Sequence, residues 1–355
     1  KIEVIDTKDL RHRKLMQGIF SPQLKEAVTT ALQEGRQAIL FLNRRGFSPI
    51  IECHQCGWSP KCPNCDVSLT YHKTQAALTC HYCGYTYRMP QECPDCHNHD
   101  LRDRGAGTEK VEESIADTFP NARIARMDLD TTRTRNAYER IIAEFAGNKT
   151  NLLIGTQMVT KGLDFNSVSV VGILSADSLL NQPDFRAYEH AFMMMTQVAG
   201  RAGRKGQQGK VILQTSRPTL SVIKEIATNN YSEFFGHLMQ ERRDFCYPPF
   251  TRLIYVYLKH RDDNLVDTAA ILLASLLRNK FQSQQLPSGS GVQILGPDRP
   301  SVSRIKRLCI RKIMLKIPTT MGIAGTRRAI TDTVAVLRQD QRYKSLIVFF
   351  DVDPL

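Results

Sequence analysis

The sequence lacks the features that would place the protein in a membrane or outside the cell. No apolar run approaches the roughly 20 residues that a membrane-spanning helix requires, and no secretory signal opens the chain. The first residue is Lys1 and not a methionine, so we expect further sequence upstream. These absences predict a cytoplasmic protein with no membrane partner.

A phosphate-binding loop is also missing. Such a loop reads G-x-x-x-x-G-K-[ST], because its backbone N–H groups have to surround the phosphates. The stretch "RKGQQGKV" at 204–211 does not fit, since Arg204 stands in place of the first glycine and Val211 follows the lysine. The chain has no Asp-Glu pair that could hold Mg²⁺ either. These residues alone therefore cannot hold a nucleotide together with its metal ion.

Acidic residues are scarce relative to basic ones. The chain has 48 lysines and arginines against 35 aspartates and glutamates, which gives a net charge of +13. Such an excess favours a polyanionic partner such as nucleic acid. A basic, solvated surface without such a partner is the alternative interpretation.

The first part of the chain alternates between strand and helix patterns. The predicted strands are short apolar runs, at 38–43, 122–128, 151–156, 168–174 and 210–215. The predicted helices have apolar residues at helical spacing, at 22–35, 134–146 and 186–202. This alternation is typical of an α/β domain with a parallel sheet, into which a cysteine-rich segment is inserted after the first strand.

The pattern changes after about residue 230. Strands are predicted at 250–259, 308–317 and 345–353, and helices at 264–281 and 325–339, with a turn or flexible loop at 284–293. This order predicts a small α+β domain with an antiparallel sheet. We therefore expect an α/β domain over 1–52 and 105–230, a cysteine-rich module over 53–104, and a C-terminal domain over 231–355.

Eight of the ten cysteines form four CxxC pairs, while Cys246 and Cys309 stand alone. The pairs are Cys53 with Cys56, Cys62 with Cys65, Cys80 with Cys83, and Cys93 with Cys96. Each pair places two thiolates on one side of a tight turn, as tetrahedral zinc coordination requires. Unliganded structural cysteines have no reason to fall in such pairs. The segment therefore predicts two structural Zn²⁺ sites, each with four cysteine ligands.

The spacing of the pairs favours a nested arrangement. In it, the outer pairs (Cys53, Cys56, Cys93, Cys96) bind zinc 1 and the inner pairs (Cys62, Cys65, Cys80, Cys83) bind zinc 2. The stretch between the inner pairs, "DVSLTYHKTQAALT" at 66–79, alternates like the two strands of a ribbon hairpin. Sequential pairing is the alternative, and it would force the first two turns together across a short connection.

Two polar motifs in the α/β domain suit a nucleotide. "LLIGTQMVTKGLDF" at 152–165 is a strand followed by a polar loop, in which Thr156 and Gln157 offer a hydroxyl and an amide group. Gly162 permits close backbone approach, and Asp164 can accept a hydrogen bond from a ribose hydroxyl. Because ligands of parallel sheets bind outside the carboxyl ends of the strands, we expect this loop to line a site there.

The second motif, "QVAGRAGR" at 197–204, contains two arginines. Gln197, Arg201 and Arg204 have the spacing of residues on one helix face. The guanidinium fork suits phosphate oxygens, and the small residues between the arginines let a phosphate approach. A solvated helix end, with Arg204 beside the C-terminal dipole, is the alternative interpretation.

These motifs resemble those of known helicases. "GTQMVTKGLDF" and "QVAGRAGR" are similar to motifs V and VI of superfamily-two helicases. Nearly from end to end the chain resembles the primosomal protein N′ (PriA) family of replication-restart helicases, through "FLNRRGF", the four CxxC spacings, "GTEKVEE", "FPNARIARMD", "QPDFRAYE", "YPPF" and "DVDP". The resemblance implies a RecA-like helicase lobe 2, nested zinc pairing, and a preceding lobe with the P-loop, so that this chain is the C-terminal half.

The resemblance also implies roles for individual residues. Arg201 and Arg204, with Gln197, would be the catalytic group, the arginines reaching a phosphate held by the other lobe. Gly162 and Asp164 would sense the nucleotide. The residues expected to contact DNA are Thr156, Gln157, Lys161, Arg304, Lys306 and Arg311. Near the last three, Cys309 and Ile310 stand where the family has an aromatic residue.

The resemblance implies ATP- and Mg²⁺-dependent 3′→5′ unwinding at stalled forks in the bacterial cytoplasm, at the nucleoid. The partners would be forked and single-stranded DNA, single-strand-binding protein, and primosome and helicase-loading proteins, with the helicase itself a monomer. The alternative function is a non-enzymatic zinc-ribbon adaptor that binds nucleic acid through charge. The two helicase-like motifs distinguish these functions, because an adaptor would not need them.

Overall fold

The protein is described by a computed structural model that divides into two units. The first unit contains residues 1–47 and 106–238, and the second contains residues 48–105 and 239–355. The structure describes residues 2–42, 50–53, 58, 60–64, 69–72, 77–80, 85–104, 114–128, 131–132, 134–160, 165, 167–181, 184–203, 209–282, 291–300 and 302–354.

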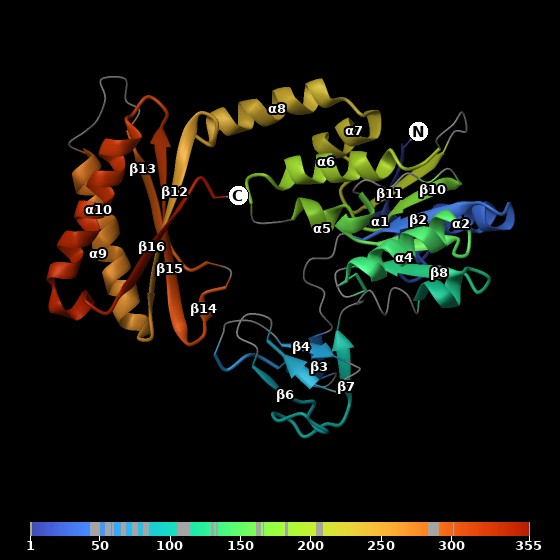
Figure 1. The fold of residues 1–355 in the computed structure, drawn as a ribbon, viewed down its shortest axis with the longest axis horizontal. Helices are drawn as coiled ribbons and strands as arrows, with labels where there is room; N and C mark the ends of the chain where they lie inside the picture. Colours follow the sequence, from blue (N-terminus) through green and yellow to red (C-terminus); the bar gives the residue numbers. More distant parts are fainter. Residues whose placement is uncertain are drawn as a thin grey trace. The chain divides into compact units, whose positions relative to one another are not determined.

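The first unit is built on a six-stranded sheet in which every neighbouring pair is parallel (Figure 1). From one edge to the other, the strands are β1 (Ile2–Asp6), β11 (Lys210–Thr215), β10 (Val168–Ile173), β2 (Gln37–Phe41), β9 (Leu152–Gly155) and β8 (Ile124–Met127). The predicted parallel sheet is confirmed. Sequence reasoning missed the edge strand β1, which a short helix follows directly.

The strands of this sheet are buried on both faces, which explains their continuous apolar sequences. Successive residues of β2 alternate between two hydrophobic cores: Ile39 and Phe41 lie in one, and Ala38 and Leu40 in the other. Its helices include α1 (Thr7–His12), α2 (Pro22–Gln33), α4 (Arg135–Ala146), α5 (Asp177–Leu180), α6 (Ala187–Ala199), α7 (Ser221–Thr228) and α8 (Tyr231–Asp244). Helices α1 and α2 contribute to the second core, and α4 to α8 to the first.

Local sequence signals set where two of these helices begin. Ser21 caps α2 by accepting a hydrogen bond from the Leu24 N–H at 3.3 Å, and a proline occupies the first position of that helix. Thr134 caps α4 in the same way, accepting from the Ala137 N–H at 3.3 Å. The remaining apolar spacing then turns one face of each helix towards the sheet.

A buried glutamine ties the sheet to the segment before α2. The Gln214 side chain accepts a hydrogen bond from the Ser21 N–H at 2.8 Å. It donates to the Ile19 carbonyl at 2.9 Å and to the Leu174 carbonyl at 3.0 Å. The Gln214 side chain thereby supplies hydrogen-bond partners to three backbone groups outside helices and strands. Without such partners, burying these groups would be costly.

The cysteine-rich segment forms two small antiparallel sheets in the second unit. Strands β3 (Ile50–Cys53) and β7 (Leu101–Arg104) pair at its two ends. Between them lie β4 (Thr70–His72), β5 (Ala77–Thr79) and β6 (Thr86–Arg88), with β5 at the centre. The pairing of β4 with β5 confirms the hairpin predicted within 66–79.

The C-terminal part of the second unit is an antiparallel sheet with two helices on one face (Figure 1). Its elements are β12 (Thr251–His260), α9 (Asp263–Gln282), β13 (Gln293–Asp298), β14 (Arg304–Ile305), β15 (Leu308–Pro318), α10 (Ile323–Gln339) and β16 (Ile347–Val352). The sheet order is β13-β15-β12-β16, with the short β14 paired to β15. This is the split βαβ arrangement, and it confirms the predicted α+β domain.

Among the described residues, no helix combines the length and the apolar character needed to cross a membrane.

We predict that Gly172→Ala lowers the free energy of unfolding by about 1–3 kcal/mol. A methyl carbon at Gly172 would lie 2.6 Å from Cδ1 of Leu24 and 2.8 Å from Cδ2 of Leu40, so the packed core would have to shift. Gly236→Ala in α8 is the matched control, because nothing lies within 4 Å of the added carbon. Alanine favours the helix there by up to about 1 kcal/mol. Urea titrations followed by circular dichroism measure both changes, and an unweakened Gly172→Ala variant would contradict the prediction.

Candidate functional site

The first polar motif begins at the carboxyl edge of the parallel sheet, as expected. Strand β9 ends at Gly155, and the Thr156 N–H donates to the Met127 carbonyl at the end of β8, at 3.2 Å. Gln157 opens a 3-10 turn, 157–160, in which the Val159 N–H donates to the Thr156 carbonyl at 3.1 Å. A Cβ at Gly155 would lie 2.1 Å from Cγ1 of Val159, so the turn can fold back onto the strand only past a glycine.

The same segment ends at the opposite edge of the sheet. Phe165 is buried and packs edge-on against Phe145, with ring centroids 4.7 Å apart. The Ser167 carbonyl accepts a hydrogen bond from the N–H of Gln37, the first residue of β2, at 2.9 Å. Val168 then begins β10. The segment therefore crosses from the carboxyl edge to the amino edge of the sheet.

Residues 161–164 lie outside the described residues. This range contains Lys161, Gly162 and Asp164, so their side chains are not placed.

The helix before the arginine motif is shorter than predicted. Helix α6 ends at Ala199, and Gly200 caps it, so Arg201 lies in the following turn. The expectation that Gln197, Arg201 and Arg204 share one helix face is therefore wrong for Arg201. Gly200 at the C-cap and Gly203, which has a φ of 69°, let the backbone leave the helix at this point. Arg204 lies outside the described residues.

The turn that contains Arg201 lies at the amino edge of the sheet. The Gly203 N–H donates to the carbonyl of Val168, the first residue of β10, at 3.1 Å. Thr156 and Gln157 lie at the carboxyl edge, as expected, so the described residues of the two motifs lie at opposite edges. The reason is geometric: a helix that connects two parallel strands has to return to the amino edge. The turn that contains Arg201 therefore lies at the edge opposite to Thr156 and Gln157.

Three of the four turns around the cysteine pairs have the same kind of backbone hydrogen bond. The N–H of the first cysteine donates to the carbonyl five residues later in three of the four pairs: Cys53 to Trp58, Cys80 to Tyr85, and Cys93 to Asn98, each at 2.8 Å. In the remaining pair, the Asn64 N–H donates to Sγ of Cys62 at 3.4 Å. An N–H group that donates to sulfur, as Asn64 does to Cys62, stabilises the thiolate, which is the form that binds metal.

Three cysteines of the outer pairs come together. The Sγ atoms of Cys53, Cys93 and Cys96 lie within 4.8 Å of one another, with Cys53 and Cys96 at 3.5 Å. Two ligands of a tetrahedral zinc lie about 3.8 Å apart, given Zn–S bonds of about 2.3 Å. Cys53 and Cys93 are buried. The residues present therefore fit a structural zinc ion, and the fourth expected ligand, Cys56, lies outside the described residues.

The described members of the inner pairs share a small hydrophobic cluster. Cys62 and Cys80 are buried there together with Ile51, Leu69 and Leu78. Their partners Cys65 and Cys83 lie outside the described residues. In the described part of this segment the cluster is small, so we expect metal binding to supply much of its folding free energy.

The β14–β15 hairpin contacts the turn of the first inner pair. The Arg307 N–H donates to the Asn64 carbonyl at 2.6 Å, and Arg307 Nε donates to Asn64 Oδ1 at 2.8 Å. Lys306 and Arg307 both have positive φ angles, 50° and 63°, at the tip of this hairpin. Two consecutive residues of this kind normally require Asn or Gly. Sequence reasoning missed this contact, because "RIKRLCI" contains no turn residue.

The three basic residues expected to contact DNA differ in accessibility. Lys306 is exposed at the hairpin tip and Arg304 is half-buried. Arg311 has only 2% of its side chain exposed and pairs with Asp263 at 2.6 Å and with Asp267. Arg299 bridges the same two carboxylates. Arg311 is therefore neutralised inside the domain, and this placement contradicts its expected role in DNA contact.

Arg311, Arg299, Asp263, Asp267 and Cys309 form a cluster in which the pKa values of the acidic groups are shifted. Hydrogen bonds from Arg311 hold the pKa of Asp263 and of Asp267 below the usual range. Burial, followed by a hydrogen bond to Asp263, raises the pKa of the Cys309 thiol. Since the carboxylates stay charged and the thiol stays neutral near pH 7, this cluster is suited to holding β15 against α9.

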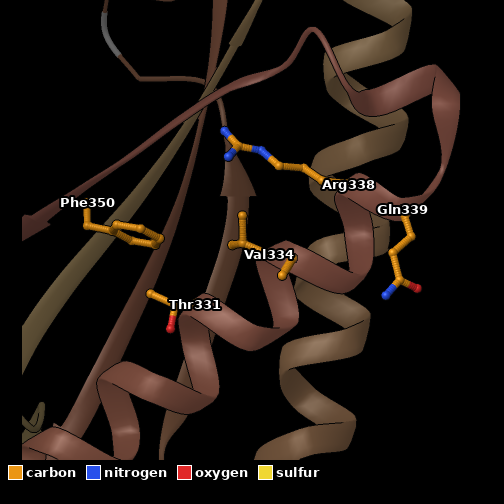
Figure 2. Close-up of a pocket in the computed structure, with 6 residues that line it drawn as sticks. Thr331, Val334, Arg338, Gln339 and Phe350 are labelled. Atoms are coloured by element: carbon orange, nitrogen blue, oxygen red, sulfur yellow. The ribbon is translucent and has the colours of Figure 1, made fainter.

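A cavity of about 370 Å³ lies between α10 and the edge strand β16 (Figure 2). It is lined by Thr331, Val334, Ala335, Arg338, Gln339 and Phe350. Figure 2 shows Phe350 reaching from the strand towards the helix. Arg338 donates to the Leu346 carbonyl at 3.2 Å, so the charged side chain in the lining supports the chain between α10 and β16.

Three family models match the chain. They are the PriA DNA helicase Cys-rich region (CRR) domain over 62–88, the helicase conserved C-terminal domain over 106–206, and the primosomal protein N C-terminal domain over 243–355. The first covers the inner cysteine pairs, and the second covers the region from the end of the cysteine-rich module to the arginine motif.

Curated relatives align with most of the chain. Replication restart protein PriA of Bacillus subtilis is 37% identical over 95% of this chain and 40% of its own length. The Synechocystis protein of the same name is 36% identical over 100% of this chain and 41% of its own. The Chlamydia muridarum protein is 42% identical over 72% of this chain and 34% of its own. The chain thus spans about two-fifths or less of the length of these relatives.

Among solved structures, S. cerevisiae Dbp5 bound to RNA and ADP BeF3 has a TM-score of 0.29 at 17% identity. The match covers 61% of this chain and 41% of that one, and no conclusion rests on a likeness this low. The sequence relatives and the family models agree with each other. With two PriA-specific models matched in turn and relatives aligned along nearly its whole length, the chain belongs to the PriA family of replication restart proteins.

Proposed function

We propose that the chain is the part of an ATP-dependent 3′→5′ DNA helicase that contains helicase lobe 2, the zinc module and the C-terminal domain. In the bacterial cytoplasm the whole protein would recognise stalled forks and start primosome assembly. The relatives are named replication restart proteins, and the helicase model matches 106–206, which supports this proposal over a non-enzymatic adaptor. The partners would be fork DNA, single-strand-binding protein and helicase-loading proteins.

The observation that carries the proposal is the placement of the two motifs on opposite edges of one sheet. The turn that contains Arg201 is held at the amino edge, because the Gly203 N–H donates to the Val168 carbonyl. Thr156 and Gln157 lie at the carboxyl edge. We assign the amino edge to the nucleotide and the carboxyl edge to DNA. One lobe would then connect ATP hydrolysis at one edge with movement along DNA at the other, the two events that a helicase has to couple.

In this assignment Arg201 and Arg204 supply charge to a γ-phosphate held by a P-loop lobe, and Gln197 on the last turn of α6 supports them. ATP with Mg²⁺ supplies the scissile phosphate bond when it is bound. Lys161 would accompany Thr156 and Gln157 on the DNA side. Arg304 and Lys306 of the β14–β15 hairpin would add DNA contacts in the C-terminal domain, whereas Arg311 would not.

We further propose that the module binds two zinc ions in nested fashion. The clustering of Cys53 with Cys93 and Cys96 supports this pairing, because these cysteines come from the two ends of the segment. The antiparallel pairing of β3 with β7 places Cys53 opposite Leu101 and so draws the ends together. Both ions would be structural, since a site with four cysteines leaves no position for a substrate.

Zinc content of double variants tests the pairing. Cys53→Ala combined with Cys93→Ala damages one nested site, so the variant is expected to keep about one zinc ion per chain. Cys53→Ala combined with Cys62→Ala damages both sites and is expected to keep almost none. Sequential pairing predicts the reverse order of zinc contents. Atomic absorption on the purified chains measures the metal, with the chain bearing Cys246→Ala as the control that should retain full content.

Loss of an arginine tests the nucleotide assignment. In a protein that carries this sequence together with a P-loop lobe, Arg201→Ala or Arg204→Ala is expected to lower ATP hydrolysis by about 10³-fold or more. DNA binding should remain nearly unchanged, because the DNA side is at the other edge. Arg13→Ala is the matched control, since Arg13 is 61% exposed and pairs with Asp9 on α1, and it should change neither activity. An equal loss of hydrolysis and DNA binding would show that these arginines bind DNA instead.

The chain by itself is expected to hydrolyse no ATP, with or without DNA. Its sequence contains neither a P-loop nor an Asp-Glu pair, so the phosphates and the metal ion lack a binding site. A phosphate-release assay on the purified chain, with single-stranded and forked DNA added, measures this. DNA-stimulated hydrolysis above the level of the Arg201→Ala chain would contradict the prediction.

A further inference from the structure

The face of the C-terminal sheet opposite α9 and α10 carries aromatic and basic side chains. Ile254, Val256 and Leu258 of β12 lie in the core against the helices, so Tyr255, Tyr257 and Lys259 lie on the other face. The strand register extends this face to the neighbouring strands. Tyr257 lies opposite Lys312 of β15 and opposite Phe349 of β16. Tyr255 lies opposite Met314 of β15 and opposite Asp351 of β16, so the face also carries one carboxylate.

The three rings on this face form one continuous group. Tyr257 and Phe349 are stacked, with centroids 4.8 Å apart and an interplanar angle of 9°. Tyr255 meets Tyr257 edge-on, at 6.2 Å and 86°. Phe349 remains 38% exposed although it lies in a folded sheet. Large rings that are held in fixed positions and still meet solvent are available for an external partner.

Each end of this aromatic group is covered by an ammonium group. Lys259 Nζ lies 4.5 Å from the centroid of Phe349, and Lys312 Nζ lies 4.8 Å from that of Tyr255. Both lysines are on long, flexible stems at half-exposed positions. They therefore cover the two outermost ring faces while remaining free to rotate towards solvent.

We propose that this sheet face binds unpaired nucleotides, with bases stacked on Phe349 and Tyr255 and with Lys259 and Lys312 moved to the flanking phosphates. A base stacked on a ring contributes more than an ammonium over a ring at an exposed site, so the exchange is favourable. The displaced lysines then neutralise phosphate, which is the usual source of affinity for nucleic acid. The proposal rests on the DNA binding proposed above and deepens it.

The chemistry of the face favours nucleic acid over a protein surface. Lysine is depleted in protein interfaces because its ammonium is costly to desolvate, and here two lysines lie among the rings. It also favours single strands over duplexes. A duplex offers no free base faces, so it can use the lysines but not the rings.

Binding of labelled oligothymidine by the whole chain tests the proposal. Phe349→Leu and Tyr255→Leu keep an apolar side chain and remove the ring, and each is expected to weaken binding on the order of 10-fold. Tyr231→Leu, which removes a 60% exposed ring from α8, is the matched control and should change binding less than about twofold. A blunt duplex of equal length should be affected by Phe349→Leu less than about twofold as well. Circular dichroism melting checks that each variant is folded.

Two results would overturn the proposal. One is unchanged oligothymidine binding by both ring variants, which would leave the assignment of Arg201 untouched. The other is ultraviolet crosslinking of 5-iodouracil-substituted oligonucleotide only to peptides other than those with Tyr255, Tyr257 or Phe349. If the unaltered chain bound no oligothymidine, this proposal and the proposed DNA binding would both be wrong, whereas the hydrolysis test would still stand.

Discussion

The direction of the strands in the parallel sheet is the constraint on which the arrangement of this protein depends. A chain that leaves a parallel strand at the carboxyl edge has to return to the amino edge before the next strand begins. The chain makes this return between the end of β9 and the start of β10, and α6 makes it after β10. Both arrive beside Val168. Residues that are far apart in the sequence thereby meet at one edge, while Thr156 stays at the other.

The insertion of the zinc module is compatible with this sheet because its two ends are paired. Ile50 lies opposite Arg104, so the chain enters and leaves the module at neighbouring points. Among its described residues the module has a small apolar cluster, in which two of the five buried residues are cysteines. Its folding free energy therefore has to come largely from metal binding. The contact of Asn64 with Arg307 then joins the metal-dependent turn to the C-terminal domain.

Successive side chains of each strand in the C-terminal sheet point to opposite faces, so the two faces differ in composition. One face supplies Val256 and Leu258 to the core beneath two helices, and the other presents rings and lysines. Not all of the positive charge in the chain is available to a partner. Arg311 is neutralised by two aspartates, and the Lys316 ammonium donates to the Phe245 carbonyl at 2.6 Å inside the fold. Burial also lowers the pKa of Lys316. These two buried basic side chains count towards the net charge but are not available to a partner.

The sequence by itself determined the local features of this protein. Apolar runs located β2, β8, β9, β10 and β11, and the CxxC pairs indicated a zinc module, because each depends on residues close together in the chain. The tertiary structure decided the rest. The helix ends before Arg201 at the glycine that caps it, and the turn with Arg201 lies at the amino edge because the Gly203 N–H donates to Val168 at the start of β10. Arg311 is buried because Asp263 and Asp267, more than forty positions earlier, lie against it. No sequence pattern states which distant carboxylate or ring a side chain will meet, since that depends on how the sheets and helices pack.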